Sequence, residues 1–373
     1  MKHVASAVVL LCCFVCAMAL TASAGERGAV PTSQIDAIFA DLRSDSAPGA
    51  AVLVLRHGRA IFARGYGLSD MSAHAPITPQ TDFRLASLSK EFTATAVMLL
   101  VRDGKLRLDE PLTEALPGFP DYGRAITIRN LLNHTSGLED YEDIMAAQHG
   151  GTVPDDTPQI RDAGVVELLE QAKGTKFAPG TKWQYSNSGY ATLAMVVERA
   201  SDEKYENFVH ERIFKPLGMR HTLAYVKGEN QVPNRALGYT RGADGSWAET
   251  DQSPTSAVLG DGGIYTSLDD MARWLNGLAH HKLLTSAEIY QMSTAVNLPA
   301  AGPESEPASY GFGFFVNPYQ GHRRLWHYGE TVGFRTSVQY FPDDDLAIVV
   351  LSNRANENPG QRALKIADLF LGK

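Results

Sequence analysis

Cysteine is nearly absent from this sequence and is confined to one end of it. The 373 residues contain three cysteines, Cys12, Cys13 and Cys16, and all of them lie inside an apolar run near the N-terminus. Without that run, the chain has no disulfide, no thiol nucleophile and no cysteine ligand for a metal. Avoidance of cysteine suits a protein that works in an oxidising compartment.

Clustered positive charge is also lacking. The chain has 34 Lys and Arg residues against 42 Asp and Glu residues, a net charge of −8, and it contains no long basic run. Nucleic acids and anionic membranes are bound through clustered positive charge. We therefore expect neither as a partner, and a small-molecule substrate remains open.

Motifs that mark several other enzyme classes are missing. The sequence has no G-x-S-x-G elbow, no P-loop, no dinucleotide fingerprint with its ribose-binding acid and no H-E-x-x-H. The adjacent His280 and His281 cannot both point at one metal from a helix, and Asp343 to Asp345 lack the length of a calcium loop. We therefore expect neither a metal nor a cofactor.

The N-terminus has the pattern of a signal peptide. Lys2 supplies positive charge, residues 4–20 form an uncharged apolar run, and residues 22–24 (ASA) are small, as a signal peptidase requires. This predicts cleavage near Gly25 and a secreted or periplasmic protein with no stable membrane insertion after cleavage. The alternative is an uncleaved anchor, for which the run is short.

The strand and helix patterns predict an α+β fold. The whole sequence is 44% apolar and 20% charged, which is typical of a globular protein. A hairpin is expected near the start and further strands near the end, with helices between them. The expected strands are 50–55, 60–65, 311–316, 322–328, 334–341 and 346–352, and the clearest helices are 90–102, 164–173, 188–201, 203–214, 268–279 and 361–369.

Hairpins without strand-helix-strand alternation indicate an antiparallel sheet flanked by helices and built from both chain ends. An all-helical subdomain is then inserted between them. The predicted divisions are a signal peptide (1–24), the N-terminal part of the α/β subdomain (25–80), the helical subdomain (81–254) and the C-terminal part of the α/β subdomain (255–373).

Three short strings carry the chemistry. The first is SLSK at residues 87–90, where a helix starting near Ser87 would place Lys90 on the same face as the serine. Burial and the positive end of the helix dipole would lower the pKa of Lys90, so that it could act as a base for the serine hydroxyl. The backbone N–H of Ser87 could also meet a developing oxyanion.

The other two strings are YSN at residues 185–187 and HYG at residues 327–329. Taken alone, each has a structural explanation. Asn187 or Ser188 could cap a helix, and His327 could be an ordinary strand residue. The apolar stretch after Lys90 indicates that the first string lies at the start of a buried helix. A serine and a lysine in such a position suggest a functional role.

With these strings in this order, the chain resembles the serine β-lactamase and penicillin-binding-protein family, in its class C-like branch of D-alanyl-D-alanine carboxypeptidases, D-aminopeptidases and esterases. The S-x-x-K motif is a known signature of such enzymes. Further stretches share the likeness, so that it covers nearly all of the mature chain. They are residues 83–87 (FRLAS), 131–138 (LLNHTSGL), 216–219 (PLGM) and 262–267 (GGIYTS).

The resemblance implies a β-lactamase-like fold and a role for each matched residue. Ser87 would be acylated and Lys90 would activate it, while Tyr185 would pass a proton to the leaving group. Asn187 would bind the acyl amide of the substrate. The third string, including His327 and Gly329, would lie on the edge strand, and the backbone N–H of Glu330 would complete the oxyanion hole.

His327 departs from the lysine that many family β-lactamases carry. Because an imidazole is mostly neutral at pH 7, the positive field should be weaker, the pKa of Tyr185 should stay high and turnover should rise above neutral pH. This disfavours efficient β-lactam degradation. The Glu330 side chain is expected to face away from the site. Arg335 could bind either Glu330 or a substrate carboxylate, and we expect a surface ion pair.

We therefore predict a serine hydrolase that forms an acyl-enzyme with a small peptide, ester or β-lactam. The sequence does not separate D-peptidase, esterase and β-lactamase activities, and it does not indicate the oligomeric state. The alternative is a penicillin-binding protein or sensor that binds peptidoglycan-like peptides and turns over slowly.

Overall fold

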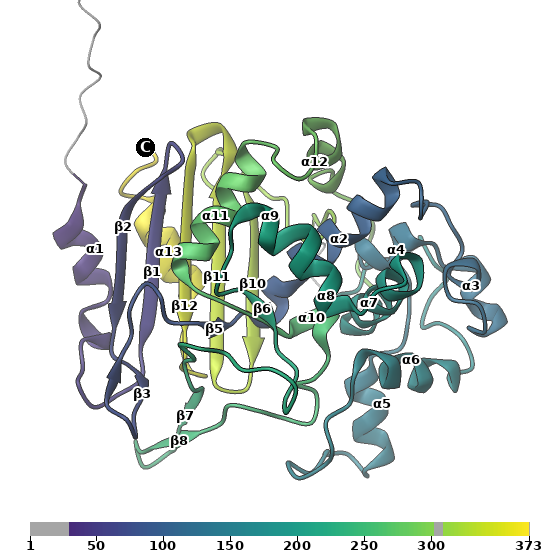
Figure 1. Ribbon diagram of the computed structural model, residues 1–373, viewed down its shortest axis with the longest axis horizontal. Coiled ribbons are helices and arrows are strands. Elements are labelled where there is room, and N and C mark those ends of the chain that lie inside the picture. Colours follow the sequence, from purple (N-terminus) through teal and green to yellow (C-terminus); the bar gives the residue numbers. More distant parts are fainter. Residues whose placement is uncertain (1–29, 302–308, 373) are drawn as a thin grey trace, which may run out of the picture. The chain divides into compact units, whose positions relative to one another are not determined.

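A computed structural model describes residues 30–301 and 309–372, so the predicted signal peptide lies outside the described residues. Five strands form one antiparallel sheet in the order β10-β11-β12-β1-β2 (Figure 1). Their bounds are Ala50–Arg56 (β1), Arg59–Tyr66 (β2), Leu325–Thr331 (β10), Phe334–Phe341 (β11) and Leu346–Ser352 (β12). Because β1 pairs with β12, the sheet is built from both chain ends, which confirms the predicted fold class.

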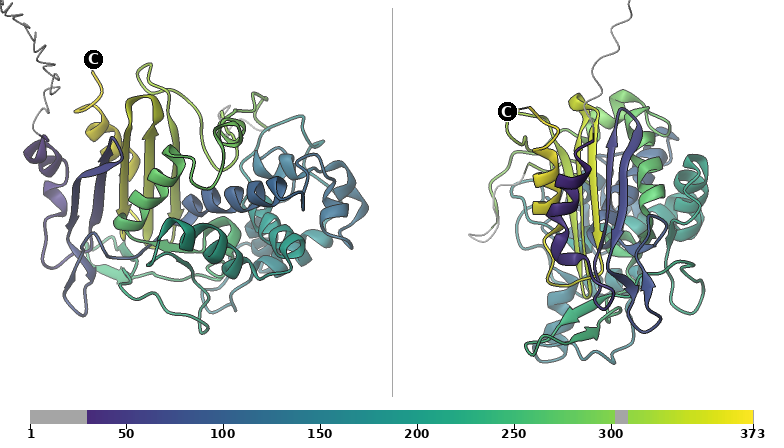
Figure 2. Two further views of the ribbon diagram at one scale, coloured as in Figure 1. Left: turned by 45° about the horizontal axis from the view of Figure 1, so that its top comes forward. Right: turned by 90° about the vertical axis from the view of Figure 1, so that its left-hand side faces the viewer.

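The burial of the strands follows their place in the sheet. The central strands β1 and β12 are largely apolar runs buried on both faces, whereas in β2 at the edge only Phe62 and Tyr66 are buried. Helices α1 (Thr32–Ile38) and α13 (Pro359–Ala367) cover one face, and α11 (Leu268–Ala279) lies on the other (Figure 2).

The region between the two ends of the sheet is mainly helical. The bounds of its α-helices are Lys90–Arg102 (α2), Leu112–Ala115 (α3), Ile128–Leu132 (α4), Tyr141–Gln148 (α5), Asp162–Glu170 (α6), Asn187–Ser201 (α7), Tyr205–Val209 (α8), Lys215–Leu217 (α9) and Leu259–Gly262 (α10), and Ser286–Met292 (α12) follows α11. The predicted helices at 90–102 and 268–279 have the observed bounds.

Short strands accompany these helices. They are Leu68–Asp70 (β3), Ala75–Pro76 (β4), Phe83–Arg84 (β5), Leu223–Ala224 (β6), Tyr239–Arg241 (β7), Trp247–Glu249 (β8) and Ile264–Thr266 (β9). Four of them, β5 to β8, lie within residues 81–254 and were not predicted. The chain from Pro31 onward packs as one compact unit, within which the predicted limits at residues 80 and 254 stay predictions.

One predicted strand was wrong, and one predicted helix is only partly α-helical. Residues 311–316 form no strand, because Gly313 has a φ of +80° in a turn where the Gly311 N–H donates to the Phe314 carbonyl. The helix predicted at 203–214 ends as α8 at Val209 and continues as one π-helical turn over His210–Phe214.

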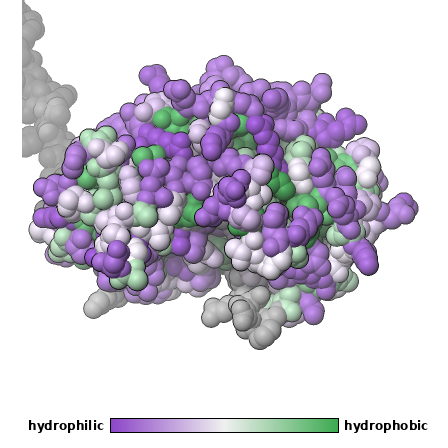
Figure 3. Space-filling model, turned by 90° about the horizontal axis from the view of Figure 1, so that it is seen from below, coloured by the Kyte–Doolittle hydropathy of each residue, from purple (hydrophilic) through white to green (hydrophobic). Residues whose placement is uncertain are grey.

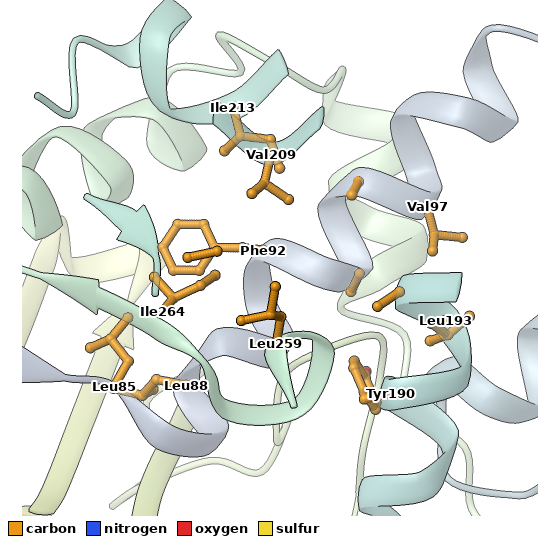
Figure 4. Packing of buried hydrophobic residues seen from close by; sticks show 14 of the residues in the cluster. Leu85, Leu88, Phe92, Val97, Tyr190, Leu193, Val209, Ile213, Leu259 and Ile264 are labelled. Atoms are coloured by element: carbon orange, nitrogen blue, oxygen red, sulfur yellow. The ribbon is translucent and has the colours of Figure 1, made fainter. Parts of the chain in front are cut away.

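Helix α2 lies inside the apolar core. Its residues Phe92 and Val97 are fully buried, and side chains from several other elements surround them (Figure 4). The surrounding residues include Leu85, Leu88, Tyr190, Leu193, Val209, Ile213, Leu259 and Ile264. Each such side chain contributes about 1.5–3 kcal/mol when it is buried. This core holds the first turn of α2 in a fixed position.

No helix in residues 30–301 and 309–372 is long and apolar enough to cross a bilayer. On the face seen in Figure 3, hydrophilic residues predominate and apolar residues form small scattered groups.

Candidate active site

Ser87 and Lys90 meet at the start of helix α2. Ser87 lies in a 3-10 turn over Ala86–Ser89, and Lys90 is the first residue of the α-helix. The turn is tighter than the predicted α-helical start, and side chains three residues apart eclipse one another in it. Lys90 Nζ therefore lies 3.1 Å from Ser87 Oγ. Ser87 is the one residue between 81 and 90 that is not fully buried.

The backbone before the serine is strained. Ala86 has a φ of +50°, in the left-handed region that non-glycine residues rarely adopt. Two residues before this bend, the buried guanidinium of Arg84 donates to the Gly262 carbonyl and to the carbonyl and hydroxyl of Ser256. These hydrogen bonds fix the backbone that leads into the bend. The strained turn presents the Ser87 hydroxyl outward while its neighbours stay buried.

Lys90 has three hydrogen-bond partners. Its Nζ lies 2.9 Å from Asn187 Oδ1 and 2.9 Å from the Asp261 carbonyl oxygen, in addition to Ser87 Oγ. The first two are acceptors only, so a neutral amine must donate both of its hydrogens to them. Its lone pair then points at the Ser87 hydroxyl. The geometry is that of a base aimed at a nucleophile.

Burial makes the neutral form of Lys90 accessible. Lys90 is completely buried, and this lowers its pKa from 10.5 to about 8. The negative charges of Asp261, Glu142 and Asp140 oppose that change, with Asp261 the largest of the three. At pH 8 about half of the lysine is therefore unprotonated.

Asn187 is free to bind Lys90 because it is not the helix cap. Asn187 or Ser188 was a possible N-cap of α7 from the sequence. The cap is instead Ser186, whose Oγ accepts the Gly189 N–H at 3.1 Å. Ser188 Oγ instead donates to the Glu139 carbonyl. One residue of shift thus turns the Asn187 amide toward the lysine.

Tyr185 lies beside the same lysine. Its ring centroid is 4.9 Å from Lys90 Nζ, and its buried hydroxyl has no hydrogen-bond partner of normal geometry among the described residues. Burial raises the pKa of Tyr185 well above 10, and the nearby Ser87 hydroxyl lowers it by less. Tyr185 is therefore a protonated phenol, able to give a proton rather than to take one.

His134 belongs to the site and was not identified as a site residue from the sequence. Its ring centroid lies 4.3 Å from that of Tyr185, and its Nδ1 accepts the Ser186 N–H at 3.1 Å. Burial lowers its pKa well below 6.5, and the charge of Lys90 adds to the effect. The signal was present in the stretch 131–138, which carried part of the family resemblance but had no role attached to it.

His327 lies on β10 with both ring nitrogens engaged. Its Nδ1 donates to the Tyr328 carbonyl at 2.7 Å, and its Nε2 accepts from the Tyr310 hydroxyl at 2.9 Å. The ring is fully buried, which lowers its pKa to about 3, with Lys90 contributing. His327 is therefore neutral, as its residue type suggested. Its contact with a substrate stays a prediction.

Gly329 and Glu330 show the two faces of the same strand. A Cβ atom on Gly329 would lie 2.0 Å from the Leu85 carbonyl oxygen, so only glycine allows β10 to approach the turn that carries Ser87. Glu330 is 61% exposed and forms an ion pair with Arg335 at 2.8 Å. This confirms the predicted surface ion pair. The oxyanion role of the Glu330 N–H stays a prediction.

No group of three or more His, Cys, Asp or Glu side chains in the described ranges is placed to hold a metal ion. What the site contains is a serine, a buried amine, a buried phenol and an amide. This set can perform acid–base and nucleophilic chemistry with the side chains alone.

Comparisons with known proteins agree with this geometry. The profile of a family described as Beta-lactamase matches residues 35–373. PbpX of Bacillus subtilis strain 168, named as a penicillin-binding protein, is 32% identical over 322 residues, which are 85% of this chain and 74% of that protein. The D-aminopeptidase of Brucella canis is 30% identical over 334 residues, which are 87% of this chain and 60% of that protein.

Solved structures show the same relationship. An octameric penicillin-binding protein homologue from Pyrococcus abyssi superposes with a TM-score of 0.79 at 26% identity, over 92% of this chain and 77% of that one. The D-amino acid amidase of Ochrobactrum anthropi SV3 superposes with a TM-score of 0.74 at 26% identity, over 91% of this chain and 98% of that one. EstCE1, described as a hydrolase with promiscuous acyltransferase activity, superposes with a TM-score of 0.74 at 25% identity, over 91% of this chain and 98% of that one.

Proposed function

The chain belongs to the Beta-lactamase family and is a serine hydrolase, and we propose that it cleaves amide or ester bonds of D-amino-acid derivatives through an acyl-enzyme on Ser87. The observation that carries this proposal is the hydrogen bonding of Lys90. Two fixed carbonyl acceptors, Asn187 Oδ1 and the Asp261 carbonyl, aim the lysine lone pair at the Ser87 hydroxyl.

Acylation follows from this arrangement. Neutral Lys90 takes the hydroxyl proton of Ser87 as the serine oxygen bonds to the substrate carbonyl carbon. The backbone N–H groups of Ser87 and Glu330 are proposed to stabilise the resulting oxyanion. Collapse of the tetrahedral intermediate breaks the bond to the leaving group, which receives its proton from Tyr185, and the Lys90 ammonium then returns a proton to the phenolate.

Deacylation reverses these transfers. A water molecule attacks the acyl carbon while Lys90, assisted by Tyr185, accepts its proton, and the Ser87 oxygen leaves with a proton from the same pair. Because the pKa of Tyr185 is well above 10, Lys90 with its pKa of about 8 is the base. Turnover should therefore rise from neutral pH to above pH 8.

The substrate class rests on the third string and on the relatives. His327 is neutral and buried, so it provides no cation to attract the carboxylate that β-lactams and carboxypeptidase substrates carry. Similar proteins include a D-aminopeptidase, a D-amino acid amidase and EstCE1. We propose D-amino-acid amides and esters as substrates ahead of β-lactams.

The test is a substrate panel with the wild type and Ser87→Ala. It contains p-nitrophenyl esters, D-amino-acid amides and a chromogenic cephalosporin, with the L-amino-acid amides as stereochemical controls. We expect turnover of esters and D-amides, little of the cephalosporin and none by Ser87→Ala. Mass spectrometry after exposure to a fluorophosphonate should find one adduct, on Ser87. Absence of that adduct refutes the nucleophile, and a lasting acyl adduct without turnover favours the slow sensor.

We also propose that the protein acts outside the cytoplasm, secreted or in the periplasm. The support is the charge at Lys2, the apolar run 4–20 and the small residues 22–24. N-terminal sequencing of the exported protein should begin near Gly25. A protein that retains Met1 in the cytoplasmic fraction would contradict the proposal.

A further inference from the structure

The middle residue of the third string, Tyr328, has no role in the proposed chemistry, yet it is unusually placed. Two large apolar side chains are exposed in the described part of the chain, Tyr290 at 70% and Tyr328 at 43%. Tyr290 is on helix α12. Tyr328 lies on β10 between His327 and Gly329, on the strand that borders the site. An exposed aromatic side chain at such a position is a candidate for contact with a substrate.

Tyr328 is held by other aromatic rings. Its ring stacks on that of Phe315 at 5.9 Å with an interplanar angle of 18°, and on that of Trp326 at 6.1 Å and 26°. Phe315 and Trp326 stack on each other at 4.6 Å, and their backbones exchange two hydrogen bonds. The Arg324 guanidinium lies 4.8 Å from the Trp326 ring. These four residues make a preorganised support, which we call the aromatic shelf.

The shelf adjoins the catalytic residues. The Tyr328 ring is 5.9 Å from that of His327, which is in turn 6.2 Å from that of Tyr185. The Tyr328 phenol is close enough to raise the pKa of Tyr185, after the larger effect of burial. Through His327 the shelf therefore lies near Tyr185, the proposed proton donor to the leaving group, at the exposed side of β10.

The charges around the shelf disfavour an anion there. Glu330 lies on the same exposed face of β10 as Tyr328, and its carboxylate is near enough to raise the pKa of the Tyr328 phenol, second to burial. The Arg335 guanidinium pairs with Glu330 and also donates to the Thr331 and Phe334 carbonyls, so its donors are committed. The Arg324 guanidinium under Trp326 is 7% exposed and donates to the Asn317 carbonyl and to Gln339 Oε1. A carboxylate on the shelf would therefore meet the Glu330 carboxylate at the surface, whereas both nearby guanidinium groups are already hydrogen-bonded.

We propose that Tyr328, supported by Phe315 and Trp326, binds the leaving group of the substrate and selects an uncharged planar or apolar group over one that carries a carboxylate. This rests on the proposed function, because it assumes that Ser87 is acylated and that Tyr185 protonates the leaving group. It makes the enzyme an amidase or esterase rather than a carboxypeptidase. An aromatic contact of this kind contributes about 0.5–1.5 kcal/mol beyond area burial.

The test varies the leaving group while the acyl group stays constant. D-alanine p-nitroanilide, D-alaninamide and D-alanyl-D-alanine share the D-alanyl group and leave as an aromatic amine, ammonia and an amino acid with a carboxylate. In Tyr328→Ser we expect kcat/KM for the anilide to fall roughly tenfold and for the amide less than twofold. Tyr328→Phe keeps the ring and should retain most of the anilide activity, and Tyr290→Ser is the matched control for loss of an exposed tyrosine.

Other outcomes overturn the proposal. An equal loss on the anilide and the amide in Tyr328→Ser means that the tyrosine supports the site and does not select the leaving group. Preference of the wild type for D-alanyl-D-alanine over the anilide also contradicts it. Thermal melting of Tyr328→Ser shows whether the variant is folded before either result is used.

A labelling experiment separates this proposal from failure of the proposed function. A phosphonate with a p-nitrophenoxide leaving group and one with fluoride form the same Ser87 adduct. If the wild type turns over no substrate but labels with both, the proposed turnover fails, and the shelf is still tested by the ratio of the two labelling rates. We expect Tyr328→Ser to lower the p-nitrophenoxide rate roughly five- to tenfold relative to fluoride. An unchanged ratio refutes the shelf.

Discussion

The candidate active site has two walls that differ in the burial of their side chains. The helix wall consists of Ser87, Lys90, Tyr185 and Asn187, of which Lys90 is fully buried and the other three are partly exposed. The strand wall is β10, where Tyr328 and Glu330 are exposed on one face while His327 and Gly329 are buried on the other. Burial sets the protonation states in the helix wall, whereas the strand wall presents Tyr328 and Glu330 to solvent. In our two proposals, catalysis is assigned to the helix wall and selection of the leaving group to the strand wall.

The largest effect on activity is expected from Lys90, the proposed general base in the helix wall. Lys90→Met removes the proton acceptor, and Lys90→Arg keeps a cation that is not deprotonated in proteins. Both should lower kcat/KM by about 10²–10⁴-fold on the best ester or D-amide of the panel. The exposed Lys105 gives the control Lys105→Met, which should be unchanged. Retention of activity by Lys90→Arg would mean that another group is the base.

The junction of the two walls should be the next most sensitive point. In Gly329→Ala the new Cβ would collide with the Leu85 carbonyl oxygen, which pushes β10 away from the serine turn. A displacement of about 1 Å can cost about 10²-fold in rate, so we expect a loss of that order in kcat, with a lower melting temperature. Gly174, whose Cβ position is open, supplies the control Gly174→Ala. Wild-type kcat in Gly329→Ala would show that the close approach is unimportant.

A smaller, pH-dependent effect is expected at Asp261. Its charge raises the pKa of Lys90, so Asp261→Asn should lower that pKa further while the backbone carbonyl contact and the bond from Tyr141 remain. More lysine is then neutral below pH 8. The rising limb of the kcat/KM profile should move to lower pH, with a gain of roughly two- to fivefold at pH 6.5 and none at pH 9. A shift of the limb to higher pH contradicts the assignment of Lys90 as base.

The smallest effect on activity, and a clear one on stability, is expected at Asp82. Its buried carboxylate oxygens have no hydrogen-bond partner of normal geometry in the described ranges, unlike the fully partnered Lys90. Burial raises the pKa of Asp82 from 3.8 to about 7. Between these values the native state binds more protons than the unfolded chain, so the free energy of unfolding falls as pH rises.

Asp82→Asn removes this penalty, which is present above pH 7 and absent below pH 4. The variant should be more stable than the wild type by on the order of 1 kcal/mol at pH 8 and equal to it near pH 4, measured by urea unfolding. Asp109→Asn changes an exposed carboxylate and is the control. A gain in stability that is the same at both pH values would show that the titration of Asp82 is not its cause.

Much of the fold was predictable because its elements are locally consistent. Helices α2 and α11 begin and end where their sequence patterns do, and strand β12 is a nearly continuous apolar run joined to β11 by a polar turn. Residues 311–316 resembled a strand in composition, but Gly313 turns the chain there under the constraint of packing against Lys90 and Glu91. That constraint comes from residues more than 200 positions away, and local patterns do not contain it.

The site was predictable to a similar degree. Ser87, Lys90, Tyr185 and Asn187 were identified from their strings, and the structure brings them together. Their neighbours were missed. His134 lies in the family-like stretch 131–138 but no role was attached to it, and Asp261 contacts Lys90 through a backbone carbonyl, which has no signature in the sequence. Likewise, Tyr328 was interpreted as part of a string and not as a side chain exposed to solvent.

The sequence by itself determined which reacting groups this protein has: a serine three residues before a lysine, a tyrosine two residues before an asparagine, and a strand with a histidine in place of a lysine. Only the tertiary structure decided their charge states and directions. Burial lowers the pKa of Lys90, keeps Tyr185 protonated and leaves His327 a neutral hydrogen-bonded ring, because the energy of an ionised group depends on everything packed around it.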